Sequence, residues 1–252
     1  MSAHPLGVDF GGSGIKAAPV DLERGDFAAD RVRIETPQPA TPEAVADVLA
    51  ELVASFSSDN GDESPIGVTV PGVVRDGVVS SAANIDASWI GVDAGALFSR
   101  ATGRPALAIN DADAAGLAET RWGAARGQHG LVIVTTLGTG IGSALLLDGV
   151  LVPNSELGHV EIDGRDGEKW AANSAREAED LSWEDWAARL TTYYRTLERL
   201  LTPDLFVVGG GVSKHADKFL PMVDVTTPII PALLRNKAGI VGAALHAAGT
   251  VG

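Results

Sequence analysis

The 252-residue sequence contains no cysteine. This absence excludes disulfides, thiolate metal sites and a cysteine nucleophile, so any bound metal must be held by oxygen or imidazole ligands. Long apolar runs are also missing: the longest, such as 131–137 and 144–147, fall well short of the roughly 20 residues that a membrane-spanning helix needs. The N-terminal stretch MSAHPLGVDF has neither a basic leader nor a long apolar core. The sequence therefore predicts a cytoplasmic protein with no membrane partner.

Positive charge is scarce, because 19 Lys and Arg face 33 Asp and Glu and the formal net charge is −14. A general nucleic-acid surface needs a basic face that displaces counterions from phosphates, so no nucleic-acid partner is expected. A polyanion would have to bind at a local group of cations, since salt screens charges beyond roughly 8–10 Å. The candidates for such a basic track are Lys16, Lys214, Lys218, Arg235 and Lys237.

The chain is rich in glycine, and one glycine pattern occurs twice. GSGIKAA at 12–18 returns as GTGIGSA at 138–144. Branched apolar residues flank each copy, which predicts a strand, a glycine turn and a second strand. A turn with several glycines lets backbone N–H groups approach a phosphate that side chains would otherwise block. Two copies predict paired lobes that grip a phosphate chain from both sides, and a pair of plain tight hairpins is the alternative.

The surroundings of the turns favour a phosphate site that differs from the common nucleotide motifs. Neither turn fits G-x-x-x-x-G-K-[ST], and neither fits G-x-G-x-x-G in order. Asp9 stands just before the first turn, where a carboxylate could hold a hydrated Mg²⁺ beside the phosphates. A turn-capping aspartate is the alternative role for this residue.

Further strands and helices place these turns in an α/β protein of two lobes. A helix is expected to start at Thr41-Pro42, and a longer one at Ser182, with an aromatic stripe predicted to be core. Short strands are expected at 66–70, 106–109 and 206–208, and hairpin turns at Asp76-Gly77 and Asp148-Gly149. We expect a small N-terminal lobe at 1–110, a larger lobe at 111–237, and a small-residue helix at 238–250 that packs back on the first lobe.

Asp111 is the candidate for a catalytic base, because it follows a predicted strand and begins DADAAG. Phosphoryl transfer to an alcohol needs in-line positioning, charge neutralisation and a carboxylate that takes the alcohol proton. Helix N-capping is the alternative role for Asp111, and Asp113 is its nearest rival.

Polar residues that punctuate Gly-rich, apolar segments are candidates for binding a sugar. Vicinal hydroxyls are best held by carboxylates and amides, which can accept and donate hydrogen bonds. The candidates from the residues alone are Asn84, Asn110, and Glu156 with His159 three positions later. A structural role is the alternative for the histidine.

Taken together, these motifs resemble the ROK family of sugar kinases, and within it the polyphosphate glucokinases of actinobacteria. The likeness runs over most of the chain, through DFGGSGIK (9–16), PGVV (71–74), ANID (83–86), NDADA (110–114), LGTGIG (137–142), ELGH (156–159), VVGGGVSK (207–214) and AGIVGA (238–243). The resemblance implies the two-lobed actin/hexokinase-like (ribonuclease H-like) fold, with the active site in the cleft between two α/β lobes.

The resemblance also implies roles for individual residues. It makes Asp111 the base, and it makes Asp9 a holder of Mg²⁺, through water. The implied contacts to the phosphate donor are Gly11, Gly12, Ser13, Gly14, Lys16, Gly138, Thr139, Gly140, Gly210, Gly211 and Lys214, of which the glycines at 209–211 match the place where ATP-using relatives hold adenosine. The implied sugar contacts are Gly72, Asn84, Asn110, Asp111, Glu156, His159 and Glu168.

The chain departs from the family pattern in one segment. Many ROK proteins carry a cysteine-rich zinc motif shortly after E-[LI]-G-H, where this chain has GRDGEKWAANSAREAED. No structural zinc is expected, and Mg²⁺ is the expected cofactor. The resemblance implies transfer of the terminal phosphoryl group of inorganic polyphosphate to the 6-hydroxyl of glucose, with ATP as a second donor, by a homodimer.

Three other functions stay open at this stage. The first is an ATP-dependent hexokinase acting on glucose, mannose or another hexose, because epimers differ by the direction of a single hydroxyl. The second is a sugar-responsive repressor, which would need a DNA-binding helix-turn-helix before the first glycine turn, and this turn already starts at Gly11. The third is a catalytically idle actin-like protein, which would not need Asp111 together with Glu156 and His159.

Overall fold

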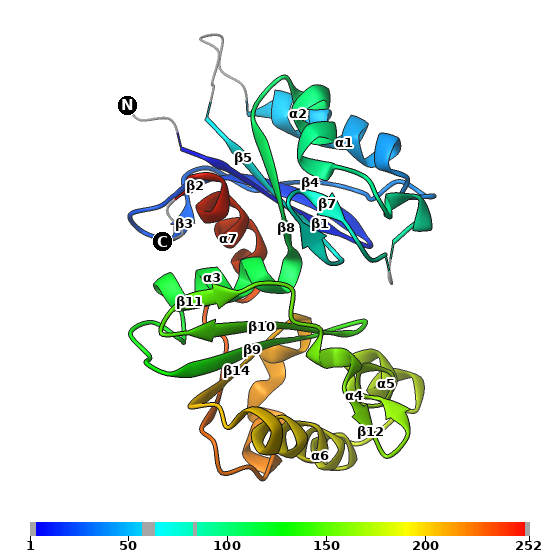
Figure 1. The fold of residues 1–252 in the computed structure, drawn as a ribbon, viewed down its shortest axis with the longest axis vertical. Helices are drawn as coiled ribbons and strands as arrows, with labels where there is room; N and C mark the ends of the chain where they lie inside the picture. Colours follow the sequence, from blue (N-terminus) through cyan, green and yellow to red (C-terminus); the bar gives the residue numbers. More distant parts are fainter. Residues whose placement is uncertain (1–3, 57–63, 83–84, 250–252) are drawn as a thin grey trace. The chain divides into compact units, whose positions relative to one another are not determined.

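The computed structural model describes residues 4–56, 64–82 and 85–249, and these form two compact units (Figure 1). The first unit comprises the described residues of Met1–Ala118 and Lys237–Gly252, and the second comprises Glu119–Asn236. The sequence placed the division at residue 110, which is the last residue before helix α3 (Asp111–Trp122), whereas the compact units divide inside this helix. Each unit has its own sheet and its own apolar core.

The sheet of the first unit combines an antiparallel pair with parallel strands. Strands β1 and β2 are antiparallel, while β5 is parallel to β1 and β8 is parallel to β5. The order is β3-β2-β1-β5-β8, with β4 also paired to β2. The strands are β1 (Leu6–Gly11), β2 (Gly14–Asp21), β3 (Asp26–Phe27), β4 (Val32–Ile34), β5 (Ile66–Val70) and β8 (Ala106–Asn110).

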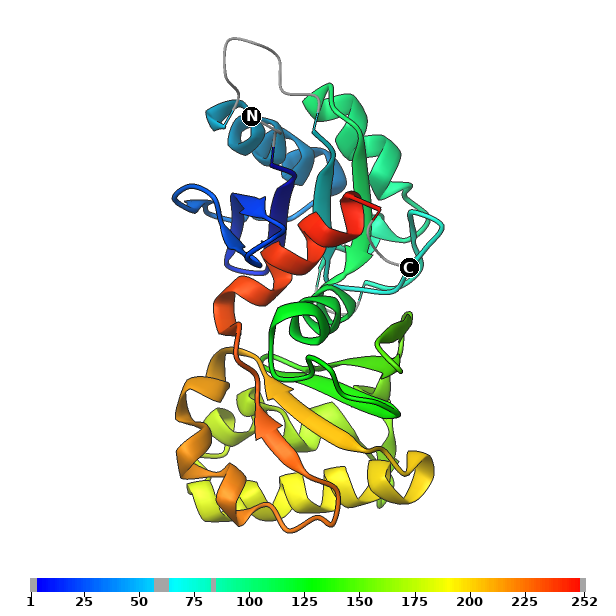
Figure 2. The same ribbon diagram turned by 90° about the vertical axis from the view of Figure 1, so that its left-hand side faces the viewer.

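Helices cover both faces of this sheet (Figure 2). Helices α1 (Pro42–Ser55) and α2 (Ala94–Thr102) pack on one face and α7 (Ala238–Ala247) on the other. As predicted, Thr41 caps α1, because its hydroxyl accepts a hydrogen bond from the N–H of Ala44 and Pro42 begins the helix. The remaining elements of the unit, apart from the first part of α3, are the hairpin β6 (Val74–Arg75) and β7 (Val78–Val79) and the 3₁₀ turn η1 (Ala87–Trp89).

Helix α7 lies unusually close to its neighbours, as its small residues predicted. An added Cβ at Gly7 of β1 would lie 1.9 Å from the carbonyl oxygen of Ile240, and one at Gly67 of β5 would lie 1.8 Å from that of Ala243. On the other side, a Cβ at Gly242 would lie 1.8 Å from the carbonyl oxygen of Ala114. These glycines are therefore fixed by close backbone approach, and they bind the C-terminal helix into the first unit.

The second unit repeats the strand pattern of the first. Strands β9 and β10 are antiparallel, while β14 is parallel to β9 and β15 is parallel to β14. The repeated glycine pattern thus corresponds to a repeated topology, in which each glycine turn joins the antiparallel pair. The strands, in the order β11-β10-β9-β14-β15, are β11 (Val150–Val152), β10 (Ile141–Leu147), β9 (Leu131–Leu137), β14 (Leu205–Gly209) and β15 (Ile229–Pro231).

The long helix α6 (Trp183–Leu201) supplies the core of the second unit. Ser182 caps it by accepting a hydrogen bond from the N–H of Asp185, and the aromatic stripe is buried as predicted, with Trp186 and Tyr194 fully enclosed. The buried side chains of this stripe therefore pack within the core of the second unit. The other elements are η2 (Leu157–His159), β12 (Glu161–Ile162), β13 (Arg165–Asp166), α4 (Gly167–Ala171), α5 (Asn173–Ala178), η3 (Gly211–Lys218), η4 (Leu220–Met222) and η5 (Arg235–Lys237).

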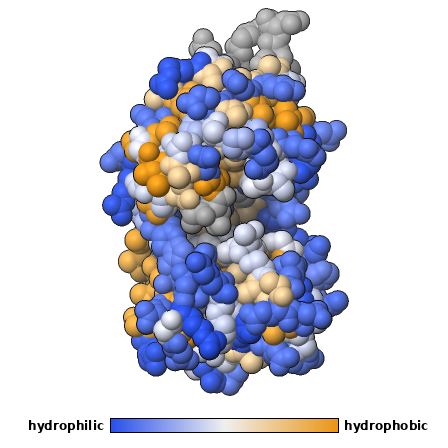
Figure 3. Space-filling model, turned by 90° about the vertical axis from the view of Figure 1, so that its right-hand side faces the viewer, coloured by the Kyte–Doolittle hydropathy of each residue, from blue (hydrophilic) through white to orange (hydrophobic). Residues whose placement is uncertain are grey.

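The surface agrees with the acidic, polar composition. Hydrophilic residues cover most of the face drawn in Figure 3, and apolar residues form separate patches there. Within the described ranges, every helix is too short or too polar to cross a bilayer.

Candidate functional site

The parallel strands of the first unit end at the residues that the sequence singled out. Strand β1 ends at Gly11, β5 at Val70 just before Gly72, and β8 at Asn110 just before Asp111. The carboxyl ends of parallel strands share one edge of a sheet, and ligands of open α/β sheets bind at that edge. The fold therefore gathers the predicted base, the first glycine turn and two predicted sugar contacts at one edge.

Asp9 is held beside this edge by two side chains. Its carboxylate accepts a hydrogen bond from Lys16 Nζ at 3.1 Å across the β1–β2 pair, and another from the Thr69 hydroxyl at 3.3 Å. The Asp9 side chain is 24% exposed, so solvent still reaches it. A carboxylate with spare lone pairs next to the glycine turn fits a hydrated Mg²⁺. The described contacts of Asp9 go to strand side chains, and none of them is a turn cap.

Two carbonyl groups of the first glycine turn accept hydrogen bonds from side chains. The Thr36 hydroxyl donates to the carbonyl of Gly11 at 2.5 Å, and Arg33 donates to that of Ser13 at 2.7 Å. An added Cβ at Gly12 would meet no atom within 4 Å. A pocket of about 210 Å³ opens beside the turn, lined by Phe10, Gly12, Thr36, Gln38, Pro39, Ala40, Ile85 and Asp86. The exposed position of Gly12 gives an anion access to the backbone.

Changing Gly12 to Ala tests whether this opening serves a ligand. The fold leaves room for the added methyl group, so the Tm should stay within about 1 °C of the wild type. If the turn binds the phosphate donor, the methyl group blocks a backbone N–H, and the KM for the donor should rise about tenfold, the value of one hydrogen bond to a charged group. Steady-state kinetics with the donor varied measures the effect. An unchanged donor KM would contradict the phosphate role of this turn.

Asn110 caps helix α3, and N-capping was the alternative role that the sequence suggested for Asp111. Its side-chain oxygen accepts from the N–H groups of Ala112 and Asp113, and its amide donates to the carbonyl of Gly72 at 3.0 Å. Asp111 accepts a hydrogen bond from Ala112 N–H as well, and it is half-buried at the start of α3. Asp113 is 1% exposed. A base must reach its substrate, so burial favours Asp111 over Asp113.

The second glycine turn is built on the same plan as the first. Ser174 donates its N–H to the carbonyl of Gly138 and its hydroxyl to that of Thr139, at 3.1 and 2.5 Å. An added Cβ at Gly138 would meet no atom within 4 Å. In both turns, therefore, carbonyls are engaged by neighbouring groups while one glycine faces open space. Both turns share this arrangement, although the N–H of Gly138 already donates to the carbonyl of Gly140 at 3.0 Å.

The segment Gly209–Gly210–Gly211 lies against the base of the second turn. Gly210 has a φ of +82°, and an added Cβ there would lie 2.3 Å from the carbonyl oxygen of Leu137, the residue before Gly138. Only glycine permits this approach. Two predicted donor-binding segments are thus adjacent within the second unit. Lys214 is exposed on η3, and no described contact joins its side chain to either segment.

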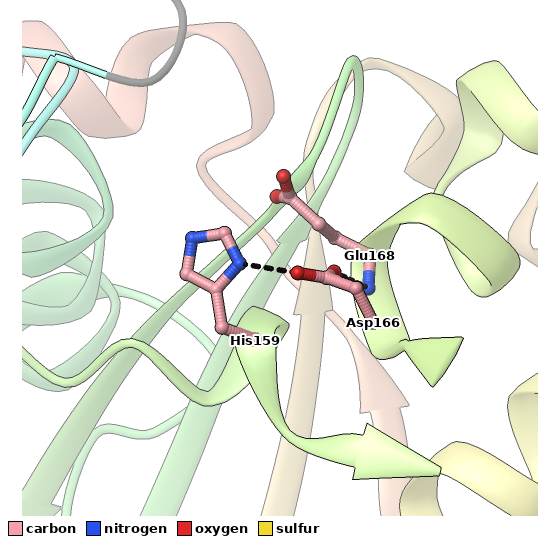
Figure 4. Close-up of side chains that lie close together, drawn as sticks. All are labelled: His159, Asp166 and Glu168. Carbon is pink, nitrogen blue, oxygen red and sulfur yellow. Dashed lines mark hydrogen bonds and ion pairs between the residues drawn. The ribbon is translucent and has the colours of Figure 1, made fainter. Parts of the chain in front are cut away.

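Two predicted sugar contacts of the second unit, His159 and Glu168, lie together with Asp166 (Figure 4), and Glu156 lies beside His159. His159 Nδ1 lies 2.9 Å from Asp166 Oδ2, and His159 Nε2 lies 3.8 Å from Glu156 Oε2. Glu168 accepts a hydrogen bond from the N–H of Ile141 at 3.1 Å, which places its carboxylate beside the second glycine turn. Asn84 lies outside the described residues.

Burial, hydrogen bonds and charge interactions shift the pKa values of Glu156, His159 and Asp166 in this cluster. Partial burial raises the pKa of Glu156 above its usual value, with a further rise from Glu168 and an opposing effect from His159. The hydrogen bond to Asp166 is the main cause of a raised pKa at His159. The ligand atoms of His159, Asp166 and Glu168 lie within 4.8 Å of one another, a spacing that a divalent cation could also bridge.

Sequence reasoning missed several residues of these sites, among them Thr69, Asp166 and Arg33. Thr69 is the single polar residue of the buried strand IGVTV, which was a usable signal for a side-chain contact. Asp166 precedes a short helix in the pattern of an N-cap, and this too could have been noticed. Arg33 contacts the first turn from a strand twenty residues away, and no local pattern indicates such a contact.

The chain is similar to known sugar kinases over most of its length. The ROK family model matches residues 5–171. A polyphosphate glucokinase of Mycobacterium tuberculosis (strain CDC 1551 / Oshkosh) is 49% identical over 243 residues, which cover 96% of this chain and 90% of that protein. The crystal structure of an inorganic polyphosphate/ATP-glucomannokinase from Arthrobacter sp. strain KM matches with a TM-score of 0.95 and 53% identity, over 99% of this chain and 100% of that one. A ROK family glucokinase from Streptomyces griseus, in complex with glucose and AMPPNP, matches with a TM-score of 0.81 and 26% identity, over 97% and 99% of the two chains. The expected actin/hexokinase-like fold is confirmed by these matches.

Proposed function

The chain belongs to the ROK family, and on this premise we propose that it transfers the terminal phosphoryl group of inorganic polyphosphate to the 6-hydroxyl of glucose. The product is glucose 6-phosphate. The observation that carries the proposal is the pair of glycine turns, each with carbonyls that accept hydrogen bonds from neighbouring side chains and one glycine at which an added Cβ would meet no atom within 4 Å. The proposal is also supported by the 49% identity to a polyphosphate glucokinase over nearly the whole chain.

The first unit supplies the base and the metal site. Asp111 accepts the proton of the sugar hydroxyl as that oxygen attacks the terminal phosphorus, while Asn110 fixes the start of α3 and so the position of Asp111. Asp9, which accepts a hydrogen bond from Lys16, would hold Mg²⁺ through water, and Lys16 and the first glycine turn would bind phosphate oxygens. Bound Mg²⁺ supplies neutralisation of the phosphate charge.

The second unit supplies a further phosphate turn and further sugar contacts. Gly138, Thr139 and Gly140 contact the donor together with the adjacent Gly210 and Gly211, and Lys214, which is exposed on η3, is a further donor contact. Glu156, His159 and Glu168 bind sugar hydroxyls as acceptors and donors. The base and the remaining sugar contacts, Gly72 and Asn110, belong to the first unit.

ATP is proposed as a second donor and mannose as a second acceptor. One solved relative is named for both polyphosphate and ATP, and for both glucose and mannose. A coupled assay with purified protein, Mg²⁺ and either donor tests the proposal. We expect glucose phosphorylation with both, faster with polyphosphate at saturation, and abolished by EDTA. Inactivity with both donors would refute the kinase activity, and ATP rates equal to or above polyphosphate rates would refute the donor preference.

We propose that the protein acts as a homodimer in the cytoplasm. The β10–β11 hairpin carries exposed apolar side chains, Leu147, Val150 and Val152, which would be covered by a second chain. Light scattering coupled to gel filtration gives the mass directly, and a monomeric mass would contradict the dimer.

A further inference from the structure

Asp166 contacts two of the proposed sugar-binding residues, His159 and Glu168. Its Oδ2 lies 2.9 Å from His159 Nδ1, and its Oδ1 accepts the backbone N–H of Glu168 at 3.1 Å (Figure 4). The same Oδ1 accepts the N–H of Lys169 at 3.4 Å, so Asp166 is also the N-cap of α4. One carboxylate therefore sets the position of a histidine on η2 and of a glutamate on α4.

Glu168 extends this set of contacts to the second glycine turn. Its Oε2 accepts the N–H of Ile141, and an added Cβ at Gly140 would lie 2.2 Å from the same oxygen. Direct hydrogen bonds thus run from Ile141 to Glu168, and Asp166 binds the backbone of Glu168 and the ring of His159. The proposed sugar contacts are fixed relative to the phosphate turn through Asp166.

We infer that Asp166 is a positioning residue that keeps the proton of neutral His159 on Nδ1 and leaves Nε2 to accept a hydrogen bond from a sugar hydroxyl. An ionised carboxylate only accepts hydrogen bonds, so the nitrogen within hydrogen-bond distance of it must carry the proton. Nδ1 lies 2.9 Å from Asp166, whereas Nε2 lies 3.8 Å from Glu156, too far for a hydrogen bond. The other ring nitrogen of a neutral imidazole is then an acceptor. This inference rests on the proposed function, because that function assigns His159 to the sugar.

The surrounding charges act on both partners of this hydrogen bond, so the neutral form of His159 is reached only above its raised pKa. Asp166, Glu168 and Glu156 all face His159 and favour its protonated form, and the hydrogen bond to Asp166 has the largest part in raising the pKa of His159. Desolvation acts to raise the pKa of Asp166, but its hydrogen bonds to His159 and to the N–H groups of Lys169 and Glu168 outweigh this, so the pKa lies below its usual value. Asp166 is therefore an anion at neutral pH, as the inference requires.

The variant Asp166→Asn tests the inference with little change in shape. Its amide oxygen can keep capping α4, but its NH₂ group donates where the carboxylate accepted, so the His159 proton should move to Nε2. We expect kcat/KM for glucose to fall about 10- to 100-fold, the range seen when a carboxylate that orients a functional histidine is removed from metal sites. The loss should fall mainly on KM for glucose, with the polyphosphate KM changed less than twofold. Since the imidazolium loses its main hydrogen-bond partner, the pH at which His159 titrates should fall.

Two controls separate orientation from folding. Asp93 caps α2 in the first unit by accepting the N–H of Ala96 at 2.8 Å, so Asp93→Asn makes the same chemical change at a helix cap away from the sugar contacts. It should leave the glucose KM unchanged. Asp166→Ser retains a good capping residue but loses the contact with the ring, and it should reproduce the kinetic loss.

The tautomer of His159 is read directly from ¹⁵N NMR of histidine-labelled wild-type protein, with the signal assigned by its loss in His159→Gln. Protonation at Nδ1 in the neutral wild type, and at Nε2 in Asp166→Asn, supports the inference. Protonation at Nε2 in the wild type would overturn it, and this measurement needs no active variant. Failure of glucose phosphorylation by the wild type would instead overturn the proposed function. If the wild type contains a stoichiometric metal that Asp166→Asn lacks, these side chains bind a cation. That result would overturn the inference.

Discussion

Replacing Asp111 by Asn is expected to lower kcat for glucose phosphorylation about 100- to 10,000-fold, the usual contribution of a general base. Asn has nearly the same shape and can still accept the hydrogen bond from Ala112 N–H, but it cannot take the proton of the attacking hydroxyl. The cap of α3 is made by Asn110 and stays in place. Steady-state rates with polyphosphate and glucose at saturation measure the effect.

A control variant measures the effect of removing a negative charge from the first turn of a helix. Glu43 is an exposed acidic residue in the first turn of α1, and Glu43→Gln removes the same charge there. Both substitutions should cost less than about 1 kcal/mol of stability, because a first-turn carboxylate contributes roughly 0.3–1 kcal/mol through the helix dipole. Only Asp111→Asn should lose activity. If the Asp111→Asn enzyme kept more than a tenth of the wild-type kcat, another group would be the base.

Replacing Gly67 by Ala is expected to destabilise the first unit by about 3 kcal/mol or more, at the upper end of overpacking effects. The new methyl group would lie 1.8 Å from the carbonyl oxygen of Ala243, and the obstacle is the backbone of α7, which cannot rotate away as a side chain can. To relieve the contact, α7 must move off β5. A chain of this size loses roughly 2–4 °C in Tm per kcal/mol, so Tm should fall by about 6–12 °C.

Gly12→Ala serves as the control for this change. It adds the same methyl group to the same unit at a position with open space, so its Tm should stay close to the wild-type value. Thermal unfolding followed by circular dichroism compares the two proteins. Equal Tm values for wild type and Gly67→Ala would show that α7 does not pack against β5 at the described distance.

Local features of the chain predicted much of the fold. The hairpin turns formed where Asp-Gly pairs occur, because Asp76 and Asp148 accept the left-handed backbone that such turns need, at φ values of 50° and 51°. The caps at Thr41 and Ser182 depend on atoms within three residues of each other. The glycine repeat predicted two equivalent strand pairs, since its flanking residues carry the strand pattern themselves.

The sequence by itself therefore determined the strands, the glycine turns, the capped helices and the family, because these follow from residues close together in the chain or from motifs read in order. The tertiary structure alone decided which distant groups meet: Thr69 with Asp9, Arg33 with Ser13, and Gly67 with the backbone of Ala243. The tertiary structure also buries Asp113, which is only two residues from Asp111 in the chain. The reason is physical: a hydrogen bond or a close backbone approach between separate segments depends on sheet register and helix packing, which no short stretch of sequence contains.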